Sequence, residues 1–336
     1  MTQRLRDAMK TRYQLRLRED GSFRTLFTSD YHAPRGRRWD PELKKDIHTL
    51  LDVCDPDLFF IIGDLTDSGG LDSVEMLEEY VSDITEEIEK RQIAWAHVPG
   101  NHDGATEEGL PLSVFQAHPH CLSERGPAEV SGYGTYMLPV WPHDGHTEDG
   151  PAFVIWAMDA HSGCNRYGMD FQSPAPLVLP NMPVRFNGSD SVHFNQVAWY
   201  WDLSVELEKE YGRKIPGIIV MHSPVQEFCL VGMNPTDTEM DGIMLESPGP
   251  GAVNTGLFAA AYERGDVKTI VSGHDHLNNY SGKYMGILLT EDGSLGRNGY
   301  GIDEIRGGRL FTYSAEKPDE IPSRHVVVRD YREGAR

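Results

Sequence analysis

The chain has 336 residues, and 52 Asp and Glu against 31 Lys and Arg give it a formal net charge of −21. This charge repels polyanions and anionic membrane surfaces, so neither a nucleic acid nor a membrane is expected as a partner. The four cysteines form no C-x-x-C pair, no apolar run is long enough for a membrane span, and the first residues lack the apolar core of a signal peptide. The composition therefore predicts a cytoplasmic protein.

Short apolar runs alternate with helical patterns along most of the chain, which is the rhythm of an α/β fold. Strands are predicted at 23–29, 57–62, 93–98, 152–158, 217–221 and 267–272. Helices are predicted at 41–53, 71–91, 195–211 and 255–264. The first of these helices follows Asp40, a residue type that caps helix N-termini. Short β-rich runs between 283 and 328 are expected to add strands at a sheet edge.

The whole chain, 1–336, is interpreted as one domain with three long loops. These loops cover about residues 104–132, 161–193 and 225–252 and are rich in Gly, Pro, Asn or Ser. Loops of this length in a compact enzyme are usually functional or mobile. We therefore expect them to surround an active site and to determine which substrate enters it.

Five of the predicted strands end in side chains that bind metals or transfer protons. In chain order these are Asp30 and His32; Asp64; Asn101, His102 and Asp103; His222; and His274 and His276. Ligands of open α/β sheets bind at the carboxyl ends of the strands, so residues far apart in sequence can meet there. Each short motif alone is more often a turn with a surface side chain. The presence of all five, each after a strand, predicts a metal site.

The chemistry of these side chains indicates a pair of ions. Carboxylates, an amide oxygen and imidazoles suit Mn, Fe or Zn better than a metal that selects thiolates. Two dications about 3.5–4 Å apart repel each other by about 17 kcal/mol at an effective dielectric of about 20. Such repulsion requires an anionic bridge, and Asp64, in the middle of the set, is the candidate for the bridging carboxylate.

The ordered set resembles the calcineurin-like metallophosphoesterase superfamily through its motifs Asp30-x-His32, Gly63-Asp64, Gly100-Asn101-His102-Asp103, His222 and Gly273-His274-Asp275-His276. The resemblance implies a four-layer α/β/β/α sandwich of two mixed sheets flanked by helices. It places one metal on Asp30, His32, Asp64 and His276, and a second metal on Asp64, Asn101, His222 and His274. It also implies that His102 contacts the substrate phosphate and protonates the leaving oxygen, while Asp103 orients His102.

Two further segments, 273–282 and 299–301, are similar to the branch of purple-acid-phosphatase-like proteins that lacks the N-terminal accessory domain. Purple acid phosphatases have a tyrosine iron ligand three residues after the bridging aspartate, and here that position is Asp67. Without the tyrosinate, Mn, Zn or ferrous ions are expected. Asp67 itself is expected to cap the following turn or to hydrogen-bond a metal ligand.

Three more residues are candidates for binding the substrate. Arg35 closely follows the first motif, and arginine binds phosphate through two parallel hydrogen bonds. Asp159 and His161 follow the apolar strand predicted at 152–158, so they are expected at the same edge as the metal ligands.

The predicted reaction is the hydrolysis of a phosphate ester at a dinuclear metal site. A phosphomonoester, either a small molecule or a phosphoprotein, is the first choice of substrate. A phosphodiester such as a cyclic nucleotide is the alternative. A nuclease would need a basic groove, which the net charge opposes. A non-catalytic metal-bound scaffold is a further alternative, but a scaffold has no need of His102.

Overall fold

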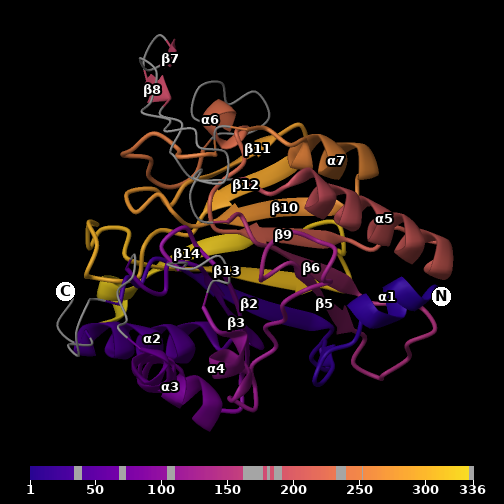
Figure 1. Cartoon of the computed structure of the whole chain (residues 1–336), viewed down its shortest axis with the longest axis horizontal. Coiled ribbons are helices and arrows are strands. Elements are labelled where there is room, and N and C mark those ends of the chain that lie inside the picture. The colour runs from indigo at the N-terminus through magenta and orange to yellow at the C-terminus, as the bar shows by residue number, and fades with distance from the viewer. Residues whose placement is uncertain are drawn as a thin grey trace.

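The computed structural model describes residues 1–33, 40–67, 73–103, 110–161, 177–179, 182–184, 191–231, 240–251 and 253–332. Two large β-sheets, packed against each other, form its centre (Figure 1). The seven-stranded sheet contains, in spatial order, β1 (Leu15–Arg16), β5 (Tyr136–Trp141), β6 (Phe153–Met158), β9 (Gly217–Met221), β10 (Val267–Ser272), β12 (Ile287–Glu291) and β11 (Ser281–Tyr284). The five-stranded sheet contains β14 (Ser323–Val327), β13 (Gly307–Ser314), β2 (Ser22–Thr28), β3 (Leu58–Ile62) and β4 (Ala94–Val98). A hairpin of β7 (Leu177–Leu179) and β8 (Met182–Val184) is separate from both.

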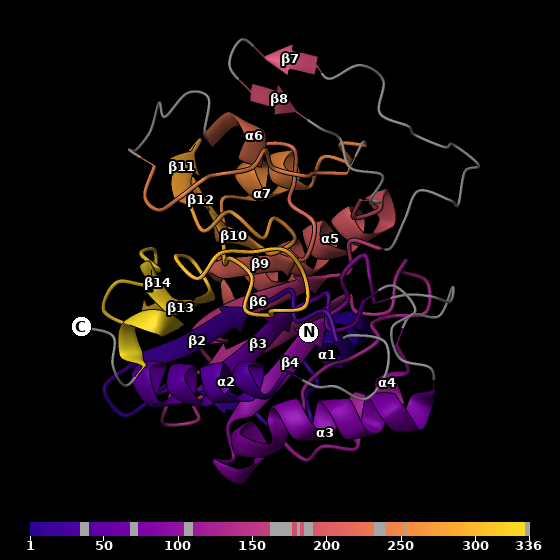
Figure 2. The same cartoon turned by 90° about the vertical axis from the view of Figure 1, so that its left-hand side faces the viewer.

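Helices cover the outer face of each sheet, as Figure 2 shows from the side. Over the five-stranded sheet lie α2 (Pro41–Cys54), α3 (Val74–Lys90) and α4 (Leu112–Gln116). Over the seven-stranded sheet lie α1 (Gln3–Ala8), α5 (Phe194–Tyr211), α6 (Phe228–Val231) and α7 (Leu257–Arg264). A 3-10 turn, η2 (Val328–Tyr331), follows the last strand. This order of helix, sheet, sheet and helix confirms the predicted four-layer sandwich.

Three buried apolar layers hold the helices and sheets together. Strand β3 contributes to two of them: Phe59 and Ile61 pack toward α2 and α3, whereas Phe60 and Ile62 pack between the sheets. Successive side chains of a strand point to opposite faces, so a strand covered on both faces needs an apolar residue at every position. This requirement explains the continuous apolar run from which β3 was predicted.

The start of α2 follows the prediction made from Asp40. The Asp40 side chain accepts a hydrogen bond from the Glu42 N–H at 2.9 Å, and Pro41 occupies the first helical position. The helix ends at Asp55, which adopts the left-handed conformation with φ of 44°. Both ends of this helix are therefore determined by local sequence.

All strands and helices predicted before residue 280 are present, within a few residues of their predicted bounds. The prediction omitted α1, β1 and β5, and it omitted α4, the β7–β8 hairpin and α6 inside the three segments expected as loops. The tail supplies four strands at sheet edges: β11 and β12 extend the seven-stranded sheet, and β13 and β14 extend the five-stranded one. No helix in the described part of the chain is long and apolar enough to cross a membrane.

The strand directions determine where a site can form. Strands β2, β3 and β4 run parallel to one another, and so do β6, β9 and β10. Parallel strands end at the same edge of their sheet, so the residues that follow them are brought together there. The chemistry-bearing motifs all follow strands of these two sets.

Candidate metal centre

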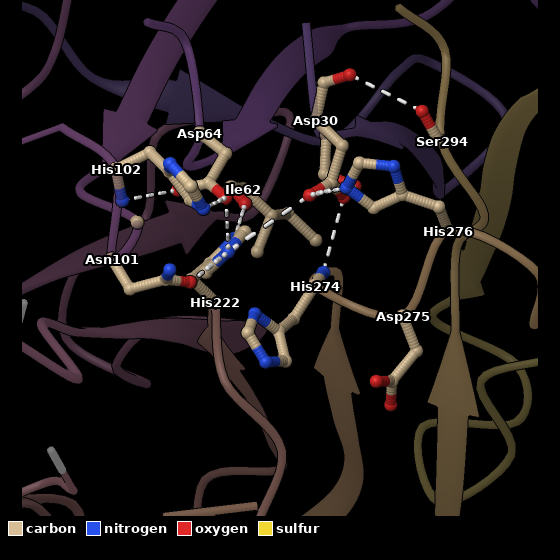
Figure 3. A network of polar contacts seen from close by, with 12 residues as sticks. Asp30, Ile62, Asp64, Asn101, His102, His222, His274, Asp275, His276 and Ser294 are labelled. Carbon is tan, nitrogen blue, oxygen red and sulfur yellow. Dashed lines mark hydrogen bonds and ion pairs between the residues drawn. The ribbon is translucent and has the colours of Figure 1, made fainter. Parts of the chain in front are cut away.

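The side chains that follow β2, β3, β4, β9 and β10 meet in one cluster where the two sheets adjoin (Figure 3). Asp30, Asp64 and His102 come from the five-stranded sheet. His222 and His274 come from the seven-stranded sheet. Neither sheet alone holds the whole set, so the site requires the packing of one sheet on the other.

The backbone of this cluster is unusual as well. Four of the predicted ligands have positive φ: Asp30 (58°), His32 (49°), Asp64 (49°) and His274 (79°). Residues other than glycine rarely adopt this conformation, and such residues gather at functional sites. Gly63, with φ of 73°, precedes Asp64, and a Cβ atom there would lie 2.5 Å from the backbone nitrogen of Gly100. The loops after β3 and β4 can approach this closely only because glycine occupies both positions.

The first group of ligands combines Asp30, His32 and His276, all buried. The Nε2 atom of His276 lies 3.1 Å from Oδ1 of Asp30 and 3.0 Å from Nε2 of His32. The Nε2 atom of His32 lies 3.7 Å from the same Asp30 oxygen. It also lies 3.6 Å from Oδ2 of Asp64, so Asp64 borders this group.

The second group combines Asp64, His222 and His274, again all buried. The Nε2 atom of His222 lies 3.1 Å from Oδ2 of Asp64 and 3.1 Å from Oδ1 of Asn101. Asp64 is thus the carboxylate that lies between the two groups. The structure thus brings the seven residues predicted as metal ligands together in one cluster.

Backbone groups orient several of these side chains. The Nδ1 atoms of His222 and His276 donate hydrogen bonds to the carbonyls of Ile62 and Tyr300, each at 2.7 Å. A proton held on Nδ1 leaves Nε2 to act as a metal ligand. The backbone N–H of His102 donates to Oδ1 of Asp64 at 2.8 Å, which directs Oδ2 toward the histidines.

The charges of the cluster favour a bound cation. Burial alone would lower the pKa of His222, yet the carboxylates of Asp64 and Asp30 raise it to about 10. Burial likewise opposes protonation of His276, and Asp30 raises the pKa of His276 to about 9. Burial, together with His222, lowers the pKa of His274 to about 4, so its imidazole is neutral at pH 7. A site with these carboxylates collects positive charge, either as protons or as metal ions.

One buried atom shows that a metal ion fits the first group. Oδ1 of Asp30 is buried and has no hydrogen-bond partner among the described residues. Its nearest polar neighbours are the Nε2 atoms of His276 and His32, which attract it only if they carry positive charge. A cation among these three atoms would satisfy the oxygen and both nitrogens, and oxygen and imidazole donors suit Mn, Fe or Zn.

His102 differs from the other histidines of the cluster in its exposure. Its side chain is 35% exposed, and its Nε2 lies 4.0 Å from Oδ2 of Asp64. Its Nδ1 lies 3.4 Å from Oδ1 of Asp67. His102 is close enough to His32 and Asp64 to form a third group of possible ligands with them. Its opening to solvent also suits it to contact a substrate.

The structure gives Asp103 a different task from the predicted one. Its buried carboxylate accepts hydrogen bonds from the backbone N–H groups of Thr66 and Gly100, each at 2.9 Å, and lies 3.4 Å from Nε2 of His97. Asp103 therefore holds the loops after β3 and β4 together. The Asp67 carboxylate lies beside Nδ1 of His102, so Asp67 has the orienting position that was predicted for Asp103.

The three predicted substrate-binding residues lie in different surroundings. Arg35 is outside the described residues. Asp159 is buried, and its carboxylate accepts hydrogen bonds from the backbone N–H groups of Tyr133 at 2.7 Å and His161 at 2.8 Å, which joins the end of β6 to the segment before β5. The His161 ring stacks on His193 with centroids 4.1 Å apart, and its Nε2 lies 3.0 Å from Oε1 of Gln196. Their roles toward a substrate remain predictions.

Comparison with known proteins agrees with this geometry. The family model of the calcineurin-like phosphoesterases matches residues 23–278. The chain belongs to this family.

Its relatives include plant proteins of the purple acid phosphatase type. A protein of Arabidopsis thaliana named "probable inactive purple acid phosphatase 14" is 28% identical over 91% of this chain and 79% of its own length. Another, "probable inactive purple acid phosphatase 29" of the same plant, is 26% identical over 88% of this chain and 77% of its own length. These two names support the predicted branch of the superfamily.

Among solved structures, a dimetal phosphatase from Danio rerio superimposes with a TM-score of 0.50 and 15% identity. The match covers 87% of this chain and 92% of the fish protein. At this identity the likeness establishes the fold alone.

Proposed function

We propose that the protein hydrolyses phosphate monoesters with two bound metal ions. The observation that carries this proposal is the pair of buried ligand groups that Asp64 joins, with one exposed imidazole, His102, beside them. When bound, two such ions lower the pKa of a water molecule and withdraw charge from phosphoryl oxygens. The remaining chemistry belongs to the side chains of this chain.

His102 is the proposed acid. Oδ1 of Asp67, 3.4 Å from Nδ1, is the proposed partner of a proton on Nδ1, and Nε2, 4.0 Å from Oδ2 of Asp64, lies on the side of the metal ligands. A proton on Nε2 can then pass to the leaving oxygen of the ester. The Asp67 carboxylate stabilises the positive charge that the ring carries before this transfer. Asp67 is a positioning residue in this scheme, because it acts through His102.

The proposed metals are Mn, Zn or ferrous iron. The ligand groups found among the described residues contain no cysteine, and Asp67 stands where purple acid phosphatases have their tyrosine ligand. We therefore expect the purified protein to show no strong charge-transfer band in visible light. We also propose a small phosphorylated molecule as the partner and the cytoplasm as the location.

The experiment that tests the function combines metal analysis with a panel of esters. The purified protein is depleted of metal by chelation, reloaded with Mn²⁺, Zn²⁺ or Fe²⁺, and assayed on an aryl monophosphate and a bis-aryl phosphate. We expect activity to disappear on depletion, to return on reloading, and to be higher on the monoester. Full activity in a protein confirmed to be metal-free contradicts the proposal, and a clear preference for the diester replaces the monoesterase with a phosphodiesterase.

The names of the plant relatives make a non-catalytic protein the second candidate. Such a protein would bind two metals in the reloading experiment and hydrolyse none of the esters. The intact ligand set and the exposed His102 favour an enzyme, because metal binding for structure needs only the buried groups.

A further inference from the structure

A loop that follows β12 lies directly against the first ligand group. A Cβ atom on Gly299 would lie 2.8 Å from Cε1 of His276 and 3.2 Å from Cδ2 of His32, so only glycine lets the backbone pass this close. The next residue, Tyr300, stacks its ring on the His276 ring with centroids 4.2 Å apart and planes 10° apart. Tyr300 is nevertheless 55% exposed. An aromatic ring is therefore presented to solvent at the border of the metal centre.

A carboxylate from a second loop joins this ring. The hydroxyl of Tyr300 donates to Oε2 of Glu246 at 3.0 Å, and the backbone N–H of Leu277 donates to Oε1 at 2.7 Å. These two bonds fix the carboxylate beside the phenol ring. In the described part of the chain, no lysine or arginine forms an ion pair with Glu246. Carboxylate oxygens have further acceptor sites, so Glu246 retains the capacity to bind a cation.

The position of Glu246 poses an electrostatic problem for a phosphatase. A phosphate monoester is an anion, and a fixed carboxylate near its binding site repels it, as does the net charge of −21. A substrate that carries a positive charge a few bonds from its phosphate turns this repulsion into attraction. Glu246 thus favours substrates that carry a positive charge near the phosphate.

The ring of Tyr300 adds to this selection. Cations are attracted to the faces of aromatic rings, and a hydrogen bond from the phenol to a carboxylate makes the ring more electron-rich. Quaternary and substituted ammonium ions are the cations that aromatic side chains bind in this manner. A carboxylate and an electron-rich ring together form the recognition elements for such a group.

We propose that Glu246 and Tyr300 form a subsite for a substituted ammonium group on the leaving alcohol of the substrate. This inference rests on the proposed phosphomonoesterase function. It assigns the substrate to a class, the phosphate monoesters of amino alcohols.

A matched pair of substrates tests the subsite. Choline phosphate and 3,3-dimethylbutyl phosphate have the same shape and differ in one positive charge. In the metal-loaded protein we expect kcat/KM to be about tenfold higher for the choline ester, the size of a cation–π contact with partial burial. In Glu246→Gln and Tyr300→Leu we expect this ratio to fall to near one. Two variants at exposed residues of the outer helices, Glu75→Gln on α3 and Tyr262→Leu on α7, are matched controls that keep the ratio of the unchanged protein.

A binding measurement supplies a readout that does not depend on turnover. The metal-loaded protein is titrated with choline and, separately, with 3,3-dimethylbutanol in a calorimeter. We expect choline to bind and 3,3-dimethylbutanol not to bind. The binding of choline should be lost in Glu246→Gln. Metal content should be unchanged in both variants at the subsite, because the hydrogen bond that orients His276 goes to the backbone carbonyl of Tyr300, which both variants retain. Loss of metal in either variant would mean that the side chains stabilise the metal centre and would overturn the subsite.

The outcomes separate this inference from the proposed function. If aryl phosphate is hydrolysed but the ratio of the two esters is near one in the unchanged protein, the subsite is refuted and the phosphatase stands. If no ester is hydrolysed but choline binds and Glu246→Gln abolishes its binding, the ammonium site at Glu246 stands, while the phosphatase and the assignment of a substrate class are refuted. A ratio that survives both substitutions also refutes the subsite.

Discussion

The metal ligands and the His102–Asp67 pair lie a few ångströms apart, yet the protein holds them in different ways. His222 is fully buried, and its ring is fixed by the Ile62 carbonyl at 2.7 Å and by Asp64 at 3.1 Å. His102 is 35% exposed, and its Nδ1 lies 3.4 Å from Oδ1 of Asp67, whose own side chain is 56% exposed. The metal ligands therefore form a buried cluster, called the cage below. His102 and Asp67 form a partly solvent-exposed pair, called the open pair.

This difference matches what each region has to do. Metal ligands must converge on a point before the ion arrives, so burial, shared carboxylates and backbone hydrogen bonds hold them in place. A proton donor must reach a substrate and then exchange its proton with water, so it needs exposure and one orienting partner. The comparison predicts that substitutions in the cage lower the metal content, whereas substitutions in the open pair lower turnover and leave the metal content unchanged.

The largest effect is expected for Asp64→Asn. The substitution weakens the anionic bridge that offsets a repulsion of about 17 kcal/mol between two dications at an effective dielectric of about 20. We expect fewer than two metals per protein, a lower melting temperature because bound metal stabilises the fold, and a loss of turnover beyond that of any variant in the open pair. Metal analysis, thermal unfolding and an aryl phosphate assay measure these effects.

A buried aspartate outside the cage is the control for this variant. Asp266 accepts hydrogen bonds from Tyr200 and Ser204 and is 3% exposed. Asp266→Asn should lower the melting temperature while two metals remain bound. Retention of both metals and of turnover by Asp64→Asn would show that Asp64 is not the bridge.

The next effect in size is expected for His102→Ala. Loss of a general acid lowers turnover by about 10²–10⁴-fold, and the cage, which His102 does not complete in this scheme, should keep both metals. The loss should be smaller for a nitrophenyl ester than for an alkyl ester, because nitrophenolate leaves without a proton. His146→Ala, at an exposed histidine, is the matched control.

Metal analysis decides between the two roles that geometry allows His102. If the alanine variant loses its metals with its activity, then His102 is a ligand together with His32 and Asp64. If it keeps full activity on an alkyl phosphate, His102 is not the acid.

Much of the cage could be predicted from the sequence, and the reason is physical. Strands covered on both faces are continuous apolar runs, so their ends are visible in the sequence, and the residues after parallel strands must meet at one edge. The strand pattern at 57–62 located β3 and with it Asp64. The alternation of strands and helices predicted an α/β fold, and the resemblance to the metallophosphoesterases implied its four layers.

The open pair could not be predicted in this way. Asp103 adjoins His102 in sequence, but its carboxylate turns inward to the N–H groups of Thr66 and Gly100. Asp67 reaches His102 because the loop after β3 folds toward the loop after β4. The sequence signal that could have indicated Asp67 is its position three residues after Asp64, in the same loop. The Glu246–Tyr300 contact joins residues 54 positions apart through their side chains, and no local pattern shows it.

A moderate effect is expected for Asp67→Asn. A hydrogen bond to a charged partner contributes about 1.5 kcal/mol at the low end of its range, appropriate to an exposed pair, and this corresponds to about a tenfold loss of turnover. The loss should appear on alkyl phosphates, be nearly absent on nitrophenyl phosphate, and leave metal content unchanged. Asp67→Glu should recover part of the activity. Equal losses on both esters would mean that Asp67 acts on the metals or the fold and not through His102.

The smallest effect is a release of protons when metal enters the cage. In the metal-free protein the carboxylates raise the pKa of His222 to about 10 and of His276 to about 9, so both rings are protonated at pH 7.5. Metal ions bind the unprotonated rings, and we expect about two protons to be released per protein. The measurement is metal titration in weakly buffered solution with a pH indicator.

The same protonation determines how the stability of the metal-free protein depends on pH. Because the folded pKa values lie above the value of about 6.5 for unfolded histidine, the stabilisation is complete below about pH 6.5 and is lost as the pH rises through 9 to 10. The metal-free protein should therefore melt at lower temperature at pH 10 than at pH 7, and the metal-loaded protein should show a smaller change. In His222→Ala the proton release should fall by about one, while in His102→Ala, outside the cage, it should stay the same. Equal proton release in all three proteins would show that the cage histidines do not carry the charge that the metal replaces.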